Sequence, residues 1–185
     1  AVTAIAPFMS IIPKGDTFQQ TYTGKNLFNI NGTQQANARC TATIDGNAIT
    51  ITSTTVGTGF YSIILPNSDS LLGKTATISF GTVTSNHNGK VNIYEAVQSQ
   101  PNSVGGWYEP INAGNVVTGG VETFTFPDSH TGSYDSFAVV LYVGSQGGST
   151  AVGDYTTYSE IQLELGSTAT SYEKFVGGTT SPNPD

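Results

Sequence analysis

The chain has 185 residues, of which 13 are acidic and 6 are Lys or Arg, so its formal net charge is −7. Charged residues make up 10% of the chain, against about 25% in an ordinary soluble domain, and neutral polar residues and Gly replace them. The chain has no basic excess to neutralise phosphates, which argues against nucleic-acid binding. No stretch approaches the ~18 consecutive apolar residues of a membrane span, so we expect no membrane insertion.

The chain contains a single cysteine, Cys40, so no intrachain disulfide can form. The absence of disulfides favours synthesis in a reducing cytoplasm, and we predict that the thiol of Cys40 is buried or passive. With 37% hydrophobic residues over this length, we expect one domain with a sizeable core.

The two ends of the chain differ from its middle. Residues 1–23 show no sustained alternation of apolar and polar residues, and we interpret them as a linker or a first strand that belongs to a host protein. Residues 176–185 are rich in Gly, Thr and Pro, as is typical of a linker. We therefore place a single module at 24–175, inserted in a longer polypeptide.

Between these ends, apolar residues alternate with polar ones at the period of two that is typical of half-buried strands. The alternating runs are 48–53, 75–80, 121–126 and 159–165. Residues 137–143 are apolar on both faces, as expected of a central strand that is covered on two sides.

Turn residues separate the predicted strands. Pro66 to Leu72 could form a short helical turn, and Asn88-Gly89 is expected to join strands 82–85 and 91–97 in a hairpin. No long segment has a helical period. These features predict an all-β protein, a jelly-roll β-sandwich of two antiparallel sheets.

The sequence does not contain a clear catalytic or metal-binding motif. His87 and His130 lie in separate polar segments without metal-ligand spacing, and we predict solvated loop histidines. Glu160 and Glu164 fall on one face of a predicted strand, about 13 Å apart, farther than the carboxylate pair of a glycosidase. We expect no enzyme activity.

Calcium binding is a more plausible role for the acidic residues than hydrolysis. Asp128, Asp135 and Asp154 could join backbone carbonyls in an oxygen site, but no Asp-x-Asp-x-Asp loop is present. Solvated acids are the favoured interpretation, and we predict no cofactor and no metal.

Aromatic residues set among amides and small residues suggest a saccharide site, because an aromatic ring packs against the C–H face of a sugar while amides and carboxylates bind its hydroxyls. Tyr94 and Asn92 share the second face of the 91–98 strand, and Tyr142 occupies the second face of its own strand. The candidate site residues are Trp107, Tyr108, Tyr94, Asn92, Glu95, Tyr142 and Glu160. Tyr155 could be a further exposed aromatic. The alternative is that these aromatics fill the core or cap its ends.

Two motifs carry a family resemblance. TGKNLF at 23–28 and SEIQLELGSTATSYE at 159–173 resemble paired signatures of the jelly-roll carbohydrate-binding modules in tail and baseplate proteins of siphophages that infect Gram-positive bacteria. The resemblance is greatest to the modules inserted in evolved distal tail proteins of phages of lactic acid bacteria. Residues 81–150 match no motif of the family, and Leu165 stands where its pattern often has a charged residue.

The resemblance implies a non-catalytic carbohydrate-binding module that adheres to host cell-wall polysaccharide during host recognition. Its partners would be a host cell-surface saccharide and other tail proteins, reached through the parent polypeptide. The module would be monomeric in isolation and would lie in the virion, at the tail tip or baseplate. Two alternatives remain: a structural spacer or protein-interaction module that binds no sugar, and a polysaccharide-degrading enzyme.

Placing residues 24–28 beside the last strand would bring the two ends of the module together, as an inserted module requires. The same packing would let Tyr172 return against the sandwich.

Overall fold

The structure, a computed structural model, describes residues 25–111, 120–144 and 149–176, with side chains 107–111 excepted. These residues form twelve strands and one short 3₁₀ helix, η1. The elements are β1 (Gln34–Ala36), β2 (Cys40–Asp45), β3 (Ala48–Ser53), β4 (Phe60–Ile64), η1 (Ser68–Leu71), β5 (Thr75–Ser79), β6 (Thr82–Ser85), β7 (Lys90–Val97), β8 (Gln100–Ile111), β9 (Val121–Thr125), β10 (Ser136–Tyr142), β11 (Tyr155–Ser159) and β12 (Gln162–Leu165). None of the helical residues in this set forms a segment long and apolar enough to cross a bilayer.

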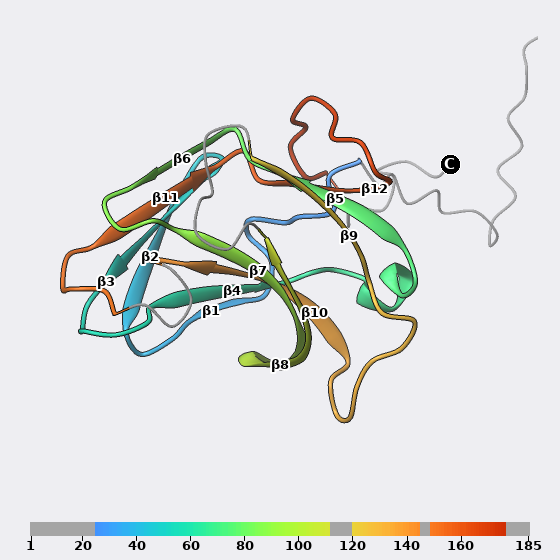
Figure 1. Cartoon of the computed structure of the whole chain (residues 1–185), viewed down its shortest axis with the longest axis horizontal. Coiled ribbons are helices and arrows are strands. Elements are labelled where there is room, and N and C mark those ends of the chain that lie inside the picture. Colours follow the sequence, from blue (N-terminus) through green and yellow to red (C-terminus); the bar gives the residue numbers. More distant parts are fainter. Residues whose placement is uncertain (1–24, 112–119, 145–148, 177–185) are drawn as a thin grey trace, which may run out of the picture.

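The strands form two layers (Figure 1). One layer is a five-stranded sheet in the order β1-β4-β10-β7-β8. The other combines a four-stranded sheet, β2-β3-β11-β6, with a three-stranded sheet, β12-β5-β9. Every pairing is antiparallel. The predicted all-β sandwich is confirmed.

The two smaller sheets act as one bent layer because two chain segments run through both. Phe80 and Gly81 lead from β5 into β6, and Glu160 and Ile161 lead from β11 into β12. Glu160 has a φ of 50°, a left-handed conformation that breaks the ladder. The predicted strand 159–165 is therefore divided in two, and Glu160 and Glu164 do not share a strand.

The core lies between the layers and contains the apolar residues that the alternation predicted. Ile49, Ile51 and Ile78 are 0% exposed, and Phe124 and Phe126 are also buried. The all-apolar segment 137–143 is confirmed as a central strand, since β10 pairs with both β4 and β7 and is buried along its length.

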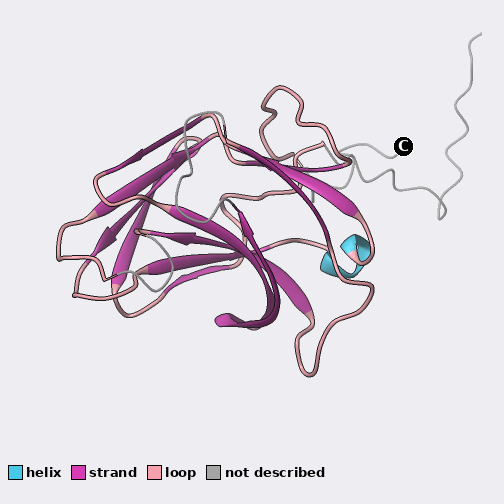
Figure 2. Ribbon diagram, in the orientation of Figure 1, coloured by secondary structure: helices cyan, strands magenta, loops and turns pink. Residues whose placement is uncertain are grey.

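The predicted hairpin at Asn88-Gly89 is wrong. β6 pairs with β11 in one layer, whereas β7 pairs with β10 and β8 in the other. Asn88 does turn the chain, with a φ of 53°, but Gly89 then passes close to Tyr158 and Thr156 as the chain crosses between layers. The short helical turn predicted near residues 66–72 is present as η1 (Figure 2).

The first and last described segments are tied together at β12. The Leu27 N–H donates to the Leu163 carbonyl at 2.7 Å. Asn26 donates to the carbonyls of Ile161 and Glu173 and accepts the N–H of Leu163. The predicted approach of the two motif segments is confirmed, and we call this set of contacts the latch.

The last segment also covers the outer face of β12. Glu164 accepts the N–H and hydroxyl of Thr170, and Gln162 accepts the N–H of Glu173. Gln162 and Glu164 are therefore 0% and 5% exposed, although alternation alone placed them toward solvent. The alternation with Ile161 and Leu163 would place Leu165 inward, but it is 51% exposed at the strand end.

Residues 1–24 and 177–185 fall outside the described residues, so the linkers predicted at 1–23 and 176–185 stay predictions.

Candidate functional site

Three of the predicted site residues meet on the outer face of the five-stranded sheet. Asn92 donates to the Tyr94 hydroxyl at 3.3 Å, and the Tyr142 hydroxyl donates to the same oxygen at 3.3 Å. The Phe60 ring lies 5.7 Å from that of Tyr142. The period-two assignment of Asn92 and Tyr94 to the second face of their strand is correct.

These side chains are not exposed to solvent, however, so their rings cannot stack on a sugar. Tyr94 is 9% exposed, Tyr142 4% and Asn92 0%, and burial raises the pKa of Tyr142 far above its ordinary value. Val104 packs against this cluster, and Asn102 donates to the Ala36 carbonyl.

Figure 1 shows why the face is covered: β8 bends strongly, and its first residues reach β1 and β4. The cluster is a second small core, as the alternative interpretation of the aromatics allowed. It packs against the outer face of the five-stranded sheet, and its tyrosine rings are not exposed to solvent.

Trp107 and Tyr108 have side chains outside the described residues, so their predicted role stays a prediction.

Glu95 lies on the opposite side of the sheet from Asn92 and Tyr94. It is 0% exposed and accepts the Thr131 N–H at 2.7 Å, and its carboxylate lies 3.2 Å from His130 Nδ1. His130 Nε2 is 3.4 Å from an Asp69 carboxylate oxygen, and its ring lies 4.7 Å from that of Phe137. Glu95 therefore anchors the loop before β10.

The prediction of a solvated loop histidine is wrong for His130, whose side chain is 13% exposed. Its ion-pair neighbours come from β7 and η1, far away in sequence, so no local pattern could reveal these contacts. His87 fits the prediction better. Its side chain is 40% exposed, and its Nδ1 lies 3.5 Å from a carboxylate oxygen of Asp154.

The acidic residues considered for calcium have separate settings. Asp135 accepts the Gln98 N–H, whereas Asp154 accepts the Ala151 N–H. Among the described residues, no three His, Cys, Asp or Glu side chains gather closely enough to hold a metal ion.

Glu160, the last predicted residue, is exposed at the bend between β11 and β12. Its side chain lies over Gly81, where a β-carbon would collide with it. Tyr172 is nearby: burial, followed by the negative charge of Glu160, raises the pKa of the Tyr172 phenol. Glu160 thus belongs to a different part of the surface from Asn92 and Tyr94.

Beside Tyr172 the structure contains a pocket that the sequence did not predict, which we call the amide pocket. Its volume is about 320 Å³, open mouth included. Its lining residues are Phe28, Asn29, Ile30, Asn31, Asn47, Ile161, Tyr172, Lys174 and Phe175. The latch forms this pocket, because it brings residues 28–31 and 172–175 together beside the β2–β3 turn.

The pocket combines an apolar floor with a polar rim. Phe28 and Ile161 are buried, and the rings of Tyr172 and Phe175 are half-buried. The side-chain oxygen of Asn29 accepts a hydrogen bond from the Asn31 N–H at 3.1 Å. Within the described residues, the side-chain NH₂ group of Asn29 and the side-chain amides of Asn31 and Asn47 make no hydrogen bond, so they are available to a ligand.

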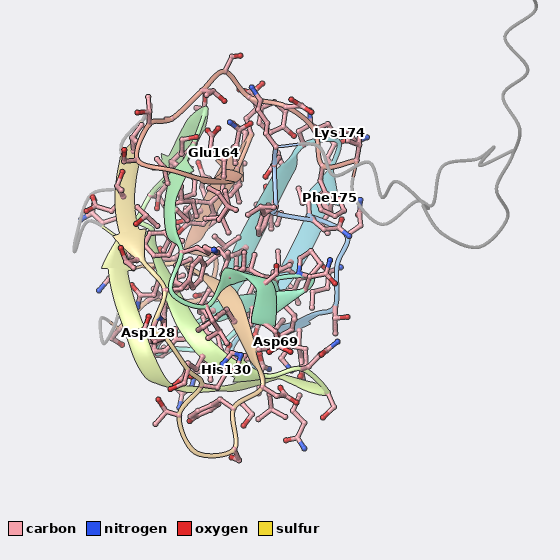
Figure 3. The ribbon with its side chains drawn as sticks, turned by 90° about the vertical axis from the view of Figure 1, so that its right-hand side faces the viewer. Asp69, Asp128, His130, Glu164, Lys174 and Phe175 are labelled. Atoms are coloured by element: carbon pink, nitrogen blue, oxygen red, sulfur yellow. The ribbon has the colours of Figure 1, made fainter. Side chains whose placement is uncertain are left out.

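Lys174 adds a cation to the rim. Figure 3 shows Lys174 and Phe175 next to each other, well away from His130 and Asp69. The pocket is thus an aromatic and amide surface at one end of the sandwich. No single segment of sequence could have revealed it, since its lining comes from four separate segments.

A second depression, near η1, is larger than the amide pocket, with a volume of about 800 Å³, open mouth included. It is lined by Leu65, Asn67, Ser68, Asp69, Ser70, Gln98 and Asp135. No aromatic ring is among these residues, so this depression lacks a stacking surface for a sugar.

The strand order and the bent second layer define a jelly-roll β-sandwich. No protein-family model matches the chain, and no curated protein matches its sequence significantly. Solved structures that resemble it include the enzymatically active domain of tailspike protein 4 of bacteriophage CBA120. That similarity has a TM-score of 0.45 and 14% identity, over 76% of this chain and 21% of that chain.

Carbohydrate-binding modules are also among the similar structures. The CBM22-1 xylan-binding domain of Paenibacillus barcinonensis Xyn10C gives a TM-score of 0.43 and 13% identity, over 75% of this chain and 90% of that chain. A variant of the CBM29-2 module complexed with mannohexaose gives a TM-score of 0.40 and 15% identity, over 73% of this chain and 82% of that chain. We assign no residue of this chain a role from these similarities.

Proposed function

We infer that this chain is a non-catalytic saccharide-binding module in which one sugar unit packs at the open mouth of the amide pocket. The observation that carries the inference is the pair of half-buried rings, Tyr172 and Phe175, beside the unbonded amides of Asn29, Asn31 and Asn47.

This arrangement suits the chemistry of a sugar. A pyranose ring has C–H faces that pack on aromatic rings and hydroxyls that pair with amides, which both donate and accept hydrogen bonds. The pocket has an apolar floor with a few convergent polar groups, as small-molecule sites usually have. The scarcity of charge in the chain favours a neutral or weakly charged ligand over a strongly ionic one.

The carboxylates support binding without catalysis. Glu164, which the sequence paired with Glu160, is held by the N–H and hydroxyl of Thr170 and by Gln162. Burial would raise its pKa, but these hydrogen bonds and the charge of Lys25 outweigh burial and lower it. A carboxylate held in this way is a poor proton donor, so it does not suit the acid role in glycoside hydrolysis.

The biological setting we propose is a phage tail. The motif segments 23–28 and 159–173 resemble those of tail and baseplate modules, and they make the latch and one wall of the pocket. The ligand would be a host cell-wall polysaccharide, and the module would be part of the virion at the tail tip or baseplate. A single site would bind weakly, and copies around a tail would add avidity.

The test is titration of the full chain against a panel of bacterial cell-wall saccharides, by glycan array and then by calorimetry. We expect at least one saccharide to bind. Tyr172→Ala and Phe175→Ala should each weaken binding about five- to a hundredfold, if stacking of a sugar on an aromatic ring contributes roughly 1–3 kcal/mol, as stacking of a base does.

Leu165→Ala is the matched control, because Leu165 is an exposed apolar side chain on β12 outside the pocket. It should bind like the wild-type chain. Failure of every saccharide to bind would overturn the function, and equal affinities of the Phe175→Ala and Leu165→Ala variants would remove the pocket from it.

A structural spacer or protein-interaction module is the second candidate. The latch favours it, because adjacent ends let a module be inserted without distorting its host. This candidate predicts no saccharide binding and a stable complex with another tail protein, which co-purification from phage particles would detect.

A further inference from the structure

The outer face of the four-stranded sheet is an ordered array of threonine side chains. The central row runs across all four strands, in the order Thr43, Thr50, Thr157 and Thr84. The adjacent row contains Thr41, Thr52 and Tyr155. We call these seven side chains the threonine face.

The face is open to solvent, and two of its hydroxyls are held in place by a hydrogen bond. Thr41, Thr43 and Thr84 are exposed at its edges, and Tyr155 is 36% exposed. In the centre of the sheet, the hydroxyls of Thr50 and Thr157 hydrogen-bond to each other at 2.8 Å. The strand spacing repeats the hydroxyl and methyl groups every ~4.8 Å across the sheet and every ~6.7 Å along it.

Charge is absent from both rows. Designed protein surfaces carry charged residues at about a quarter to a third of their positions, whereas charged residues make up 10% of this whole chain. Two charged residues lie just outside these rows: Asp45, in the next row opposite Ala48, and Arg39, two residues before Thr41, whose guanidinium donates to the Val56 carbonyl at 2.8 Å. An ionic ligand therefore finds no counter-charge on the face. A protein partner would find none of the large aromatic and Arg anchors that interface centres favour, apart from Tyr155.

We propose that the threonine face is a second binding surface, which adsorbs an extended neutral polysaccharide lying across the strands. Each Thr hydroxyl both donates and accepts, as sugar hydroxyls do, and each Thr methyl packs on sugar C–H groups. Tyr155 supplies one stacking ring. This surface extends the proposed saccharide role. The amide pocket shares no residue with it, so the two proposed sites can be tested independently.

The test measures depletion of the full chain from solution by three insoluble neutral polysaccharides: microcrystalline cellulose, chitin and curdlan. We expect at least one of them to retain the wild-type chain. The double variant Thr43→Lys/Thr84→Lys should partition at least tenfold less, because both substitutions place a hydrated charge on the central row. Thr157→Val keeps the shape but removes a hydroxyl, and it should weaken adsorption to a smaller extent.

Thr125→Lys is the matched control. Thr125 is an exposed threonine on β9, in the three-stranded sheet, and the variant should adsorb like the wild-type chain. Circular dichroism and thermal melting show whether each variant is folded, and Thr157→Val tests the face with no added charge if the double variant is not.

Three outcomes would overturn the proposal: no adsorption of the wild-type chain, equal adsorption of the folded face variants and the wild type, or equal losses in the face variants and Thr125→Lys. Phe175→Ala separates the two sites, since it should lose binding in the pocket yet keep adsorption. Loss of adsorption in Phe175→Ala together with unchanged adsorption in the face variants would assign the polysaccharide to the pocket and overturn the threonine face.

Discussion

The side-chain oxygen of Asn26 accepts the backbone N–H of Leu163 at 3.1 Å, across 137 positions of sequence. The same side chain accepts the Phe28 N–H and donates to the carbonyls of Ile161 and Glu173. One buried amide thus satisfies four backbone groups from three segments. It explains physically why an Asn follows Gly-Lys in the first motif and why that motif is accompanied by a second one at the other end.

Replacing Asn26 by Ala should destabilise the fold strongly. The variant leaves buried backbone groups unpaired, which we expect to cost about 2–4 kcal/mol of unfolding free energy. Urea denaturation measures the change, and Asn31→Ala, at an exposed position, should shift it by less than ~0.5 kcal/mol. Equal effects of the two variants would show that the latch does not hold the module together.

The Glu164 carboxylate should make the stability of the fold depend on pH in the acidic range. Its pKa in the folded chain lies below the ordinary value of 4.5, so the carboxylate form stabilises the fold. That contribution is fully present above about pH 4.5 and is lost as the pH falls through the folded-state pKa. The melting temperature of Glu164→Gln should therefore lie below that of the wild type at pH 7, and the two should converge toward pH 3.

Glu122→Gln, on β9, is the control for that series, and its difference from the wild type should stay small across the same range. A Glu164→Gln curve that runs parallel to the wild-type curve from pH 7 to pH 3 would contradict the assignment.

The two histidines should differ sharply in their effect on stability. His130→Ala removes a neighbour of the fully buried Glu95 carboxylate, and we expect a loss of about 1.5–3 kcal/mol. His87 is 40% exposed beside Asp154, and its replacement by Ala should cost less than ~1 kcal/mol. Chemical denaturation of both variants at pH 7 checks the order, and a larger loss in His87→Ala would reverse it.

Cys40 should be inert in the folded chain. Burial raises the pKa of its thiol to about 11, and the residue is 6% exposed. At pH 8 only about a thousandth of the thiol is ionised, so an aromatic disulfide reagent should label it very slowly. Labelling in strong denaturant should be complete within minutes. Rapid labelling without denaturant would show that the thiol is accessible.

Much of the sandwich could be predicted because it follows from local pattern. The alternation of Ile49 and Ile51 with threonines, and the all-apolar run 137–143, state directly which strand faces are buried. The Asn88-Gly89 turn misled because a turn signal is local, whereas the sheet that receives the next strand is decided by packing across the molecule. The same alternation placed Gln162 and Glu164 outward but could not show that residues 170–173 return to cover them.

The candidate site could be predicted less well, for a related reason. Period two assigns Tyr94 and Tyr142 to the outer face of their sheet, but it does not show that β8 bends over that face. The amide pocket joins Asn47 to Phe175, and His130 meets Glu95 and Asp69, through contacts that only the folded chain creates. The resemblance of the two end motifs pointed to the right segments without naming the residues that line the pocket.

The latch has a mechanical consequence. A pulling force applied through residues 25 and 176 would be carried first by Asn26 and its partners on β12 and Glu173, since these contacts bridge the two ends directly. The interior strands lie outside this path and would bear no load until the latch breaks. A tether attached to both ends would therefore load the latch and the pocket that it forms, while the sheet that carries the threonine face would stay undeformed until the hydrogen bonds of Asn26 break.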